Sequence, residues 1–128
     1  MKYYINKIIN SEFDAAIEKV TEALKEQGFG VLTRIDAHDK FKEKLDVDFR
    51  KYTILGACNP KFAHQALLHE DKIGTMLPCN VCVQEAGEGL VEVIAVDPMA
   101  SMMAVENEML AGIANDVKCS LTKVIEEL

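Results

Sequence analysis

The sequence contains no tryptophan, only three prolines and few aromatic side chains, which make up 6% of its 128 residues. It also lacks the motifs of several enzyme classes, since it has no phosphate-binding glycine loop, no serine nucleophile elbow and no cysteine pairs at zinc-binding spacing. No apolar run reaches transmembrane length and no basic amphipathic stretch is typical of a membrane surface, so no membrane partner is expected. Nothing in the chain indicates a bound cofactor, and none is expected.

Basic residues are in the minority, because 14 lysines and arginines stand against 21 aspartates and glutamates and leave a net charge of −7. This charge repels phosphate backbones and argues against nucleic-acid binding. The length and the 49% share of hydrophobic residues are typical of one globular domain spanning residues 1–128. The segment 1–7 is too short and too polar for a signal peptide, so we expect a cytoplasmic protein whose four cysteines are reduced.

The spacing of apolar residues predicts the secondary structure. Strands are expected over residues 2–9, 29–35, 52–58, 81–85 and 90–96, the last two joined by a turn at 86–89. Helices are expected over residues 12–27 and 39–45, from Asn59-Pro60 onward, and from Asp97-Pro98 to the C-terminus, with a loop over 71–78. Ser11 is the predicted N-cap of the first helix, with Asp14 in the capping-box position, and Gly28 is its predicted C-terminal stop. Gly56 indicates a bulge or a close approach of another segment.

This order of elements predicts an α+β fold, in which an antiparallel sheet of about five strands is backed by two main helices on one face, with short helical insertions. Alternation along the strands places Cys82 on the face opposite its valine neighbours. The same alternation directs Glu92 away from the core, into solvent or a cross-strand pair.

Two short strings carry the conspicuous chemistry of the chain. Cys58-Asn59-Pro60 follows one predicted strand, and Pro78-Cys79-Asn80 precedes another. If these strands are antiparallel neighbours, both cysteines lie at the same edge of the sheet, and the hairpin returns Asp97-Pro98 to that edge. The start of the second strand, Phe29-Gly30, is expected there too.

Three stretches carry a family resemblance: Ile54-Leu55-Gly56-Ala57-Cys58-Asn59-Pro60, Ala63-His64-Gln65-Ala66-Leu67 and Leu77-Pro78-Cys79-Asn80-Val81. With the segments from Phe41 to Phe49 and at Asp97-Pro98, the chain resembles domain-of-unknown-function family 302 over nearly its whole length. One departure is Asp46, where related sequences often carry glycine. The resemblance implies a fold like one half of the TATA-box-binding protein, in the order β-α-β(4)-α, and frequent homodimers. It implies no known activity.

Several roles remain open for Cys58 and Cys79. They could form a reversible disulfide, bind a soft metal ion or hold a small-molecule ligand, or they could be packing residues, as free cysteines often are. The helix that starts after Cys58 favours its thiolate; His64 lies one turn into that helix, and Asn80 can donate an amide hydrogen bond. A copper(I) site would add thioethers from the methionines Met99, Met102 and Met103.

Three classes of function follow from these alternatives. The preferred hypothesis is a homodimeric binding or accessory module, rather than an enzyme, with a site at the sheet edge. The candidate site residues are Cys58, Asn59, Pro60, Cys79, Asn80 and His64. The second hypothesis is a thiol-disulfide redox protein or soft-metal protein that uses the two cysteines. The third is a purely structural or assembly module.

Overall fold

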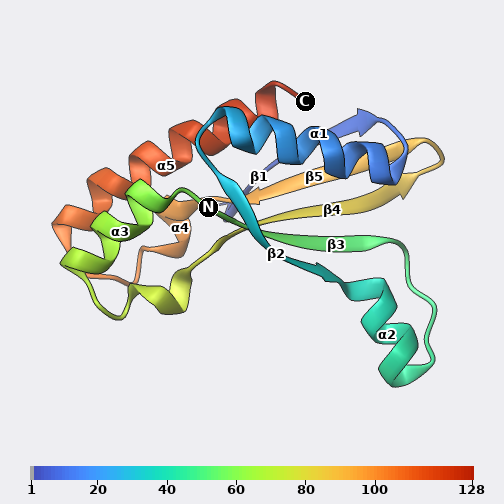
Figure 1. The fold of residues 1–128 in the computed structure, drawn as a ribbon, viewed down its shortest axis with the longest axis horizontal. Helices are drawn as coiled ribbons and strands as arrows, with labels where there is room; N and C mark the ends of the chain where they lie inside the picture. Colours follow the sequence, from blue (N-terminus) through green and yellow to red (C-terminus); the bar gives the residue numbers. More distant parts are fainter. Residues whose placement is uncertain (1) are drawn as a thin grey trace.

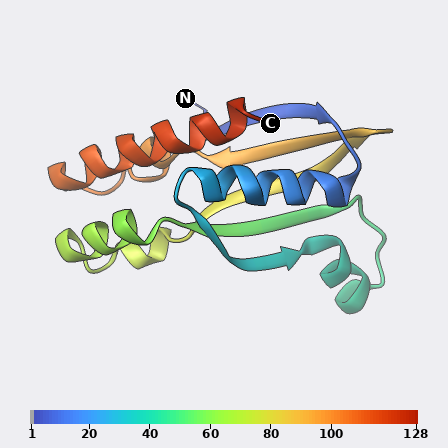
Figure 2. The same cartoon turned by 45° about the horizontal axis from the view of Figure 1, so that its top comes forward.

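The computed structural model describes residues 2–128. Its five strands form one sheet in the order β1-β5-β4-β3-β2, and every neighbouring pair is antiparallel. α1 lies along the sheet with α5 beside it, while α2 and α3 lie at opposite ends of the molecule (Figures 1 and 2). The predicted α+β fold is therefore confirmed. The elements are β1 (Tyr4–Asn10), α1 (Phe13–Glu26), β2 (Gly30–Asp36), α2 (Ala37–Leu45), β3 (Tyr52–Cys58), α3 (Pro60–His69), the 3-10 helix η1 (Ile73–Met76), β4 (Cys79–Gly87), β5 (Leu90–Val96), α4 (Pro98–Ser101) and α5 (Glu108–Glu126).

Side chains alternate between the two faces of the central strands, as they must in a pleated strand. The fully buried residues of β4 and β5 are Val81, Val83, Val91, Val93 and Ala95. They lie under the helices, whereas the residues between them are partly buried or exposed on the other side, here called the open face. Cys82 and Glu92 lie on the open face, as predicted, and Glu92 accepts hydrogen bonds from two neighbouring strands.

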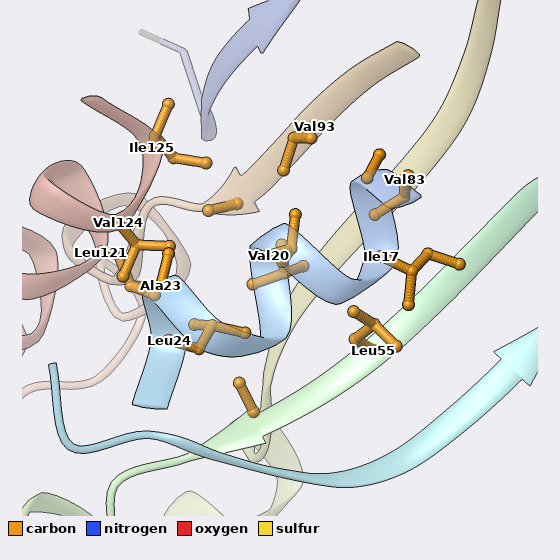
Figure 3. Close-up of a cluster of buried hydrophobic side chains, with 14 of the residues drawn as sticks. Ile17, Val20, Ala23, Leu24, Leu55, Val83, Val93, Leu121, Val124 and Ile125 are labelled. Atoms are coloured by element: carbon orange, nitrogen blue, oxygen red, sulfur yellow. The ribbon is translucent and has the colours of Figure 1, made fainter. Parts of the chain in front are cut away.

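The main core lies between this sheet and the helices α1 and α5 (Figure 3). The buried residues of α1 are Phe13, Ala16, Ile17, Val20, Ala23 and Leu24. Their spacing puts them on one side of the helix, facing Leu55 of β3 and the valines of β4 and β5. α5 contributes Leu121, Val124 and Ile125 at the edge of this layer. Each large side chain buried here stabilises the fold by about 1.5–3 kcal/mol.

α1 ends at the predicted glycine. Gly28 has a φ of 84°, in the left-handed region that glycine adopts without a Cβ clash. The amide of Phe29 donates to the Leu24 carbonyl at 2.9 Å, and the amide of Gly28 donates to the Lys25 carbonyl at 3.0 Å. This pair of bonds is the Schellman motif, which turns the chain directly from α1 into β2.

The predicted start of α1 is wrong by one residue. Glu12 is the N-cap and makes no side-chain cap bond, while the Ser11 hydroxyl donates to the Glu12 carbonyl instead. The backbone amide of Ser11 donates to the Gly89 carbonyl at 3.1 Å, next to the β4–β5 hairpin. Ser11 therefore still belongs to the edge of the sheet and cannot cap the helix, so Asp14 has no capping-box partner there.

The predicted single helix after Asp97 is also wrong, because α4 and α5 are separate helices. Asn107 starts α5 by accepting a hydrogen bond from the Met109 amide at 3.1 Å, and its own amide donates to the His69 carbonyl at 2.9 Å. The turn between the helices packs Met102 and Val105 against a second, smaller apolar cluster. Within residues 2–128, no helix is long and apolar enough to cross a lipid bilayer.

The expected loop over 71–78 contains the short helix η1, whose Ile73 is buried in that second cluster. The cluster is formed by Ala66, Ile73 and Leu110. It ties η1 to α3 and α5. This packing places the following segment, Leu77 and Pro78, against the end of the sheet, where β4 begins.

α2 contains no buried residue and is held by polar contacts at its start. The Tyr52 amide donates to Nδ1 of His38 at 3.0 Å, and the buried Thr53 hydroxyl donates to Asp36 at 2.8 Å. Burial by itself raises the pKa of Asp36, but hydrogen bonds from Thr53 and Arg34 outweigh it and lower that pKa. These contacts join the start of α2 to β3 without an apolar core.

Gly56 is buried where β2 and the segment before β4 both approach β3. The pairing of β2 with β3 shifts between Val31 and Thr33, opposite Gly56, so both parts of the prediction for this glycine are confirmed. A Cβ at position 56 would overlap the Thr33 hydroxyl and lie 2.8 Å from Cγ of Pro78.

We therefore predict that Gly56→Ala lowers the free energy of unfolding by about 1–3 kcal/mol, because the added methyl group must displace packed neighbours. Urea denaturation followed by circular dichroism measures this change. Gly112→Ala is the control, since a Cβ there meets open space in a helix and should leave stability unchanged or raise it. Equal effects of the two substitutions would contradict the prediction.

Candidate functional site

The register of β3 with its neighbours brings the two cysteines of the candidate site to one end of the sheet. Cys79 lies next to β3 and is paired with Ala57, and Cys58 is paired with Gly30 of β2. β3 ends at Cys58 and β4 begins at Cys79, so the antiparallel arrangement expected from the sequence places both residues at the same edge. Phe29 and Pro98 lie at this edge as well.

Both cysteines line one small, partly enclosed cavity, here called the thiol cavity, with a volume of about 30 Å³. Its walls come from the ends of the strands and from three helices. The apolar residues of the wall include Phe29, Phe62, Ala66, Leu77, Ile113 and Val117. Pockets for drug-sized ligands measure about 300–1,000 Å³, so the thiol cavity has room for a much smaller occupant.

The surroundings of Cys79 favour the neutral thiol. Burial, and next the nearby charge of a Cys58 thiolate, raise the pKa of Cys79 from 9.0 to about 11. The influence of Cys58 agrees with the shared cavity, because two like charges that face one space disfavour each other. Both cysteines are partly buried, and neither forms a disulfide.

Asn59 lies in the wall of the thiol cavity and also starts α3. Its side-chain oxygen accepts hydrogen bonds from the amides of Lys61 at 3.1 Å and Phe62 at 3.4 Å, so Asn59 is the N-cap of α3. A Cβ on Gly28 would lie 3.0 Å from Nδ2 of Asn59, so the glycine that ends α1 leaves room for this cap. Pro60 occupies the first turn of α3 and is exposed.

His64 and Asn80 do not reach the thiol cavity. α3 faces the cavity with Phe62, Ala63 and Ala66, and His64 is exposed on another side of the helix. Asn80 follows Cys79 by one residue and therefore lies on the open face of the sheet. The structure thus brings together Cys58, Asn59 and Cys79 and separates them from the other candidates.

One methionine of the three considered lies at the cavity. Met102, in the turn after α4, lines the wall, whereas Met99 and Met103 are exposed. Within residues 2–128, no group of three or more His, Cys, Asp or Glu side chains is arranged to hold a metal ion. A metal ion in the cavity would therefore have two thiols and one thioether as its side-chain donors from this chain.

An ion pair between the buried Asp97 and the partly exposed Lys118 fixes the helix that closes one side of the cavity. Asp97 accepts a hydrogen bond from the Met99 amide at 2.9 Å, and its other oxygen lies 3.0 Å from Nζ of Lys118 on α5. Asp97 is therefore the N-cap of α4, and this cap holds Pro98 in the cavity wall. The sequence did not indicate Lys118, because a single lysine on a helix has no spacing signal toward a distant cap.

The wall that α5 provides was also missed, although a signal existed. Ile113 and Val117 lie on the apolar stripe predicted for the C-terminal helix. Periodicity identifies such a stripe as buried, but it does not tell which part packs on the sheet and which part borders a cavity.

Comparisons with known proteins agree with this fold. The model of the family described as "Domain of unknown function DUF302" matches residues 5–128. The chain is also similar to the crystal structure of an uncharacterized conserved DUF302 protein from Bacillus stearothermophilus, with 27% sequence identity, a TM-score of 0.90 and coverage of 98% of each chain. No curated protein matched. The chain thus belongs to the DUF302 family.

Proposed function

We propose that this domain is a homodimeric binding module whose site is the thiol cavity. The observation that carries the proposal is a cavity shared by Cys58 and Cys79, which come from different strands. Protein interiors are close-packed and leave few voids larger than a water molecule. A space of about 30 Å³ beside two thiols is large enough to hold at least one water-sized molecule, and this supports a small occupant.

The walls limit what this occupant can be. Apart from the thiols and Asn59, the lining is apolar, which favours a neutral or weakly polar molecule. The volume of about 30 Å³ restricts it to a few heavy atoms unless α3 or η1 moves. We therefore propose a small, uncharged ligand as the first candidate.

A soft metal ion is the second candidate, and Met102 is the observation that favours it. Two thiols and one thioether give three sulfur donors around one space. Sulfur ligands select soft ions such as Cu(I) over hard ions such as Mg²⁺. A metal ion would replace the thiol protons, so the raised pKa of Cys79 makes metal affinity increase with pH.

A thiol-disulfide couple has less support. The resolving thiol of such a couple attacks as a thiolate, and the pKa of about 11 for Cys79 leaves roughly one molecule in 3,000 ionised at pH 7.5. An enzyme that cycles Cys79 at neutral pH would need a nearby cation to lower this pKa. Asn59 is neutral, and the other wall residues are apolar or thiol-bearing.

The choice between ligand and metal is tested by Cys79→Val, which removes one sulfur donor and keeps an apolar wall. Material released by unfolding freshly purified protein is analysed for metals and for small organic molecules. A neutral ligand should remain in Cys79→Val, whereas a metal ion should fall at least tenfold.

Cys119→Ser is the matched control, because Cys119 is exposed on α5 and lies outside the cavity. Added Cu(I) then provides a direct probe. The binding proposal is wrong if the wild-type protein releases neither kind of occupant and if one equivalent of Cu(I) leaves its melting temperature unchanged.

The protonation of Cys79 predicts how stability changes in alkali. The folded state keeps the Cys79 thiol protonated at pH values above 9.0, the ordinary pKa of this group. The contribution of this protonated thiol to stability is therefore complete below pH 9 and is lost as the pH rises through about 11. Urea denaturation under reducing conditions should show this loss in the wild type and a smaller one in Cys79→Ser. The Cys119→Ser protein should behave as the wild type, and identical alkaline profiles for all three proteins would contradict the assignment.

Homodimer formation is supported by exposed apolar side chains on α2 and the segment after it. Leu45 is 67% exposed and Val47 is 48% exposed, beside the edge-to-face pair of Phe41 and Phe49. A nine-residue helix without a buried face has little stability of its own. A second copy that covers these side chains would supply the missing apolar contacts.

We predict that light scattering after size-exclusion chromatography gives the mass of two chains for the wild type. Leu45→Glu should shift the protein toward the single-chain mass, because it places a charge in the proposed interface. Leu68→Glu is the control, since Leu68 is 70% exposed on the distant helix α3. A single-chain mass for the wild type at 100 µM would rule out a stable dimer.

A further inference from the structure

The open face of the sheet contains a second hollow, which is independent of the thiol cavity. Its volume is about 470 Å³, within the range of sites for small organic ligands. Three tyrosines line it, Tyr3 and Tyr4 at β1 and Tyr52 at β3. Residues that strand alternation places on the open face, away from the core, therefore border a space large enough for a ring system.

The floor of this hollow is apolar in its middle and polar where Gln84 and Glu92 line one end and Asn80 the other. Cys82 of β4 is paired with Ile94 of β5, and Val96 lies two residues further along β5 on the same face. Tyr4 and Tyr52 lie on strands three spacings apart in the sheet, and the rows of Tyr4–Val96 and Tyr52–Gln84–Glu92 differ by four residues along the strands, so their backbones are roughly 20 Å apart. A flat molecule of one or two rings can lie on Cys82 and Ile94, in the rows between these two tyrosines.

A series of side-chain hydrogen bonds, here called the ladder, runs across the sheet at one side of the hollow. It joins Arg50, which precedes β3, to residues of β4, β5 and β1. Nε of Arg50 donates to Gln84 at 2.9 Å, and the amide of Gln84 donates to Glu92 at 2.7 Å. The other carboxylate oxygen of Glu92 accepts from the amide of Asn6 at 2.8 Å. Both oxygens of Glu92 thus have partners, and Gln84 is held in one orientation.

The ladder leaves the cationic end of Arg50 available. Its one side-chain hydrogen bond uses Nε, and in residues 2–128 the guanidinium forms no ion pair with a carboxylate. The guanidinium carbon lies 4.3 Å from the Phe49 ring centroid and 5.9 Å from the Tyr52 ring centroid, so aromatic groups help to fix it. Its two terminal amino groups can accept a carboxylate in the bidentate geometry that arginine favours.

We propose that this hollow binds a small aromatic carboxylate. The carboxylate pairs with the terminal amino groups of Arg50, and the ring lies on Cys82 and Ile94 beside Tyr52. Glu92 lies beside Gln84, the hydrogen-bond partner of Arg50, so its charge opposes a second negative charge on the ligand and offsets part of the attraction of Arg50. The inference does not depend on the proposed function, since it concerns the other face of the sheet.

The chemistry of Tyr52 and Cys82 agrees with such a ligand. Burial, and next the hydrogen bond with Cys82, raise the pKa of Tyr52 to about 12, and burial also raises the pKa of Cys82. Both groups are therefore neutral at pH 7. They add no repulsion against an anion, and the Tyr52 hydroxyl donates its proton to the Cys82 sulfur.

Cys82 supplies a reporter for the experiment, because its thiol lines the hollow. The wild-type protein is alkylated with iodoacetamide at pH 8.5, and the rate at each cysteine is measured by peptide mass spectrometry. We expect 2-naphthoate to slow the alkylation of Cys82 at least threefold with saturation, and to leave the exposed Cys119 unaffected. The neutral analogue 2-naphthamide should bind at least tenfold more weakly.

Two substitutions test the role of the guanidinium. Arg50→Gln should remove the preference for 2-naphthoate over 2-naphthamide. Arg34→Gln should keep it, because Arg34 pairs with Asp36 outside the hollow. Amide chemical shifts of Ile94 and Val96 provide a second measurement of binding to each protein that does not require alkylation.

Several results would overturn the inference. One is an equal effect of 2-naphthoate and 2-naphthamide on the alkylation of Cys82, and another is a preference for 2-naphthoate that remains in Arg50→Gln. A third is that 10 mM 2-naphthoate changes neither the amide shifts of Ile94 and Val96 nor the alkylation rate of Cys82. Protection of Cys82 that rises with protein concentration alone would assign the hollow to a second copy of the chain instead. None of these results depends on Cys58 or Cys79, so the failure of this inference is distinct from the failure of the proposed function.

Discussion

The alternation of side chains across β3, β4 and β5 decides which residues of this domain can share a site. The valines of β4 and β5 point into the core, and this fixes the phase of every other position on those strands. Cys79 then borders the thiol cavity, whereas Cys82, three residues later, lies on the floor of the hollow on the open face. A slip of one residue in the pairing of β4 would exchange the two faces of this strand and bring the polar side chains of Asn80 and Gln84 under the helices. Both candidate sites therefore depend on the burial of the same valines.

The thiol cavity lies where two apolar clusters meet. The larger cluster joins the sheet to α1 and α5, and the smaller one joins α3, η1 and α5. Ile113 packs against both clusters and also lines the cavity. At this seam the sheet has ended, so no continuous strand sets the distance between the helices. Packing is consequently least constrained beside Cys58 and Cys79, and the Asp97–Lys118 ion pair limits how far α4 can move.

The sequence was sufficient for the parts of the structure that depend on regular spacing. The antiparallel order of β3 and β4 brought Cys58 and Cys79 to one edge as expected, because strands that alternate between apolar and polar residues favour an antiparallel sheet even where α3 and η1 lie between them. It was not sufficient where a shift of one residue along a strand decides on which face of the sheet a side chain lies. For this reason Asn80, which lies on the open face, was wrongly grouped with its neighbour Cys79. The break between α4 and α5 was missed because apolar spacing continues through the turn, and the turn is made by tertiary contacts of Met102. The same limit hid the hollow on the open face, since Arg50 meets Gln84 through strand pairing alone.

The two sites differ in how they respond to the charge of the whole protein. The net charge of −7 repels an organic anion that approaches the open face. In 0.1 M salt this repulsion is largely screened at distances beyond about 10 Å. The attraction of Arg50 is local, so selectivity for a carboxylate must come from bidentate contact and from burial of the ring on Ile94 rather than from long-range steering. The thiol cavity has no ionic group in its wall, and burial favours neutral thiols there. One sheet thus presents a charged recognition surface on one face and an uncharged, sulfur-lined space at the end of the other, and ligands that suit one do not suit the other.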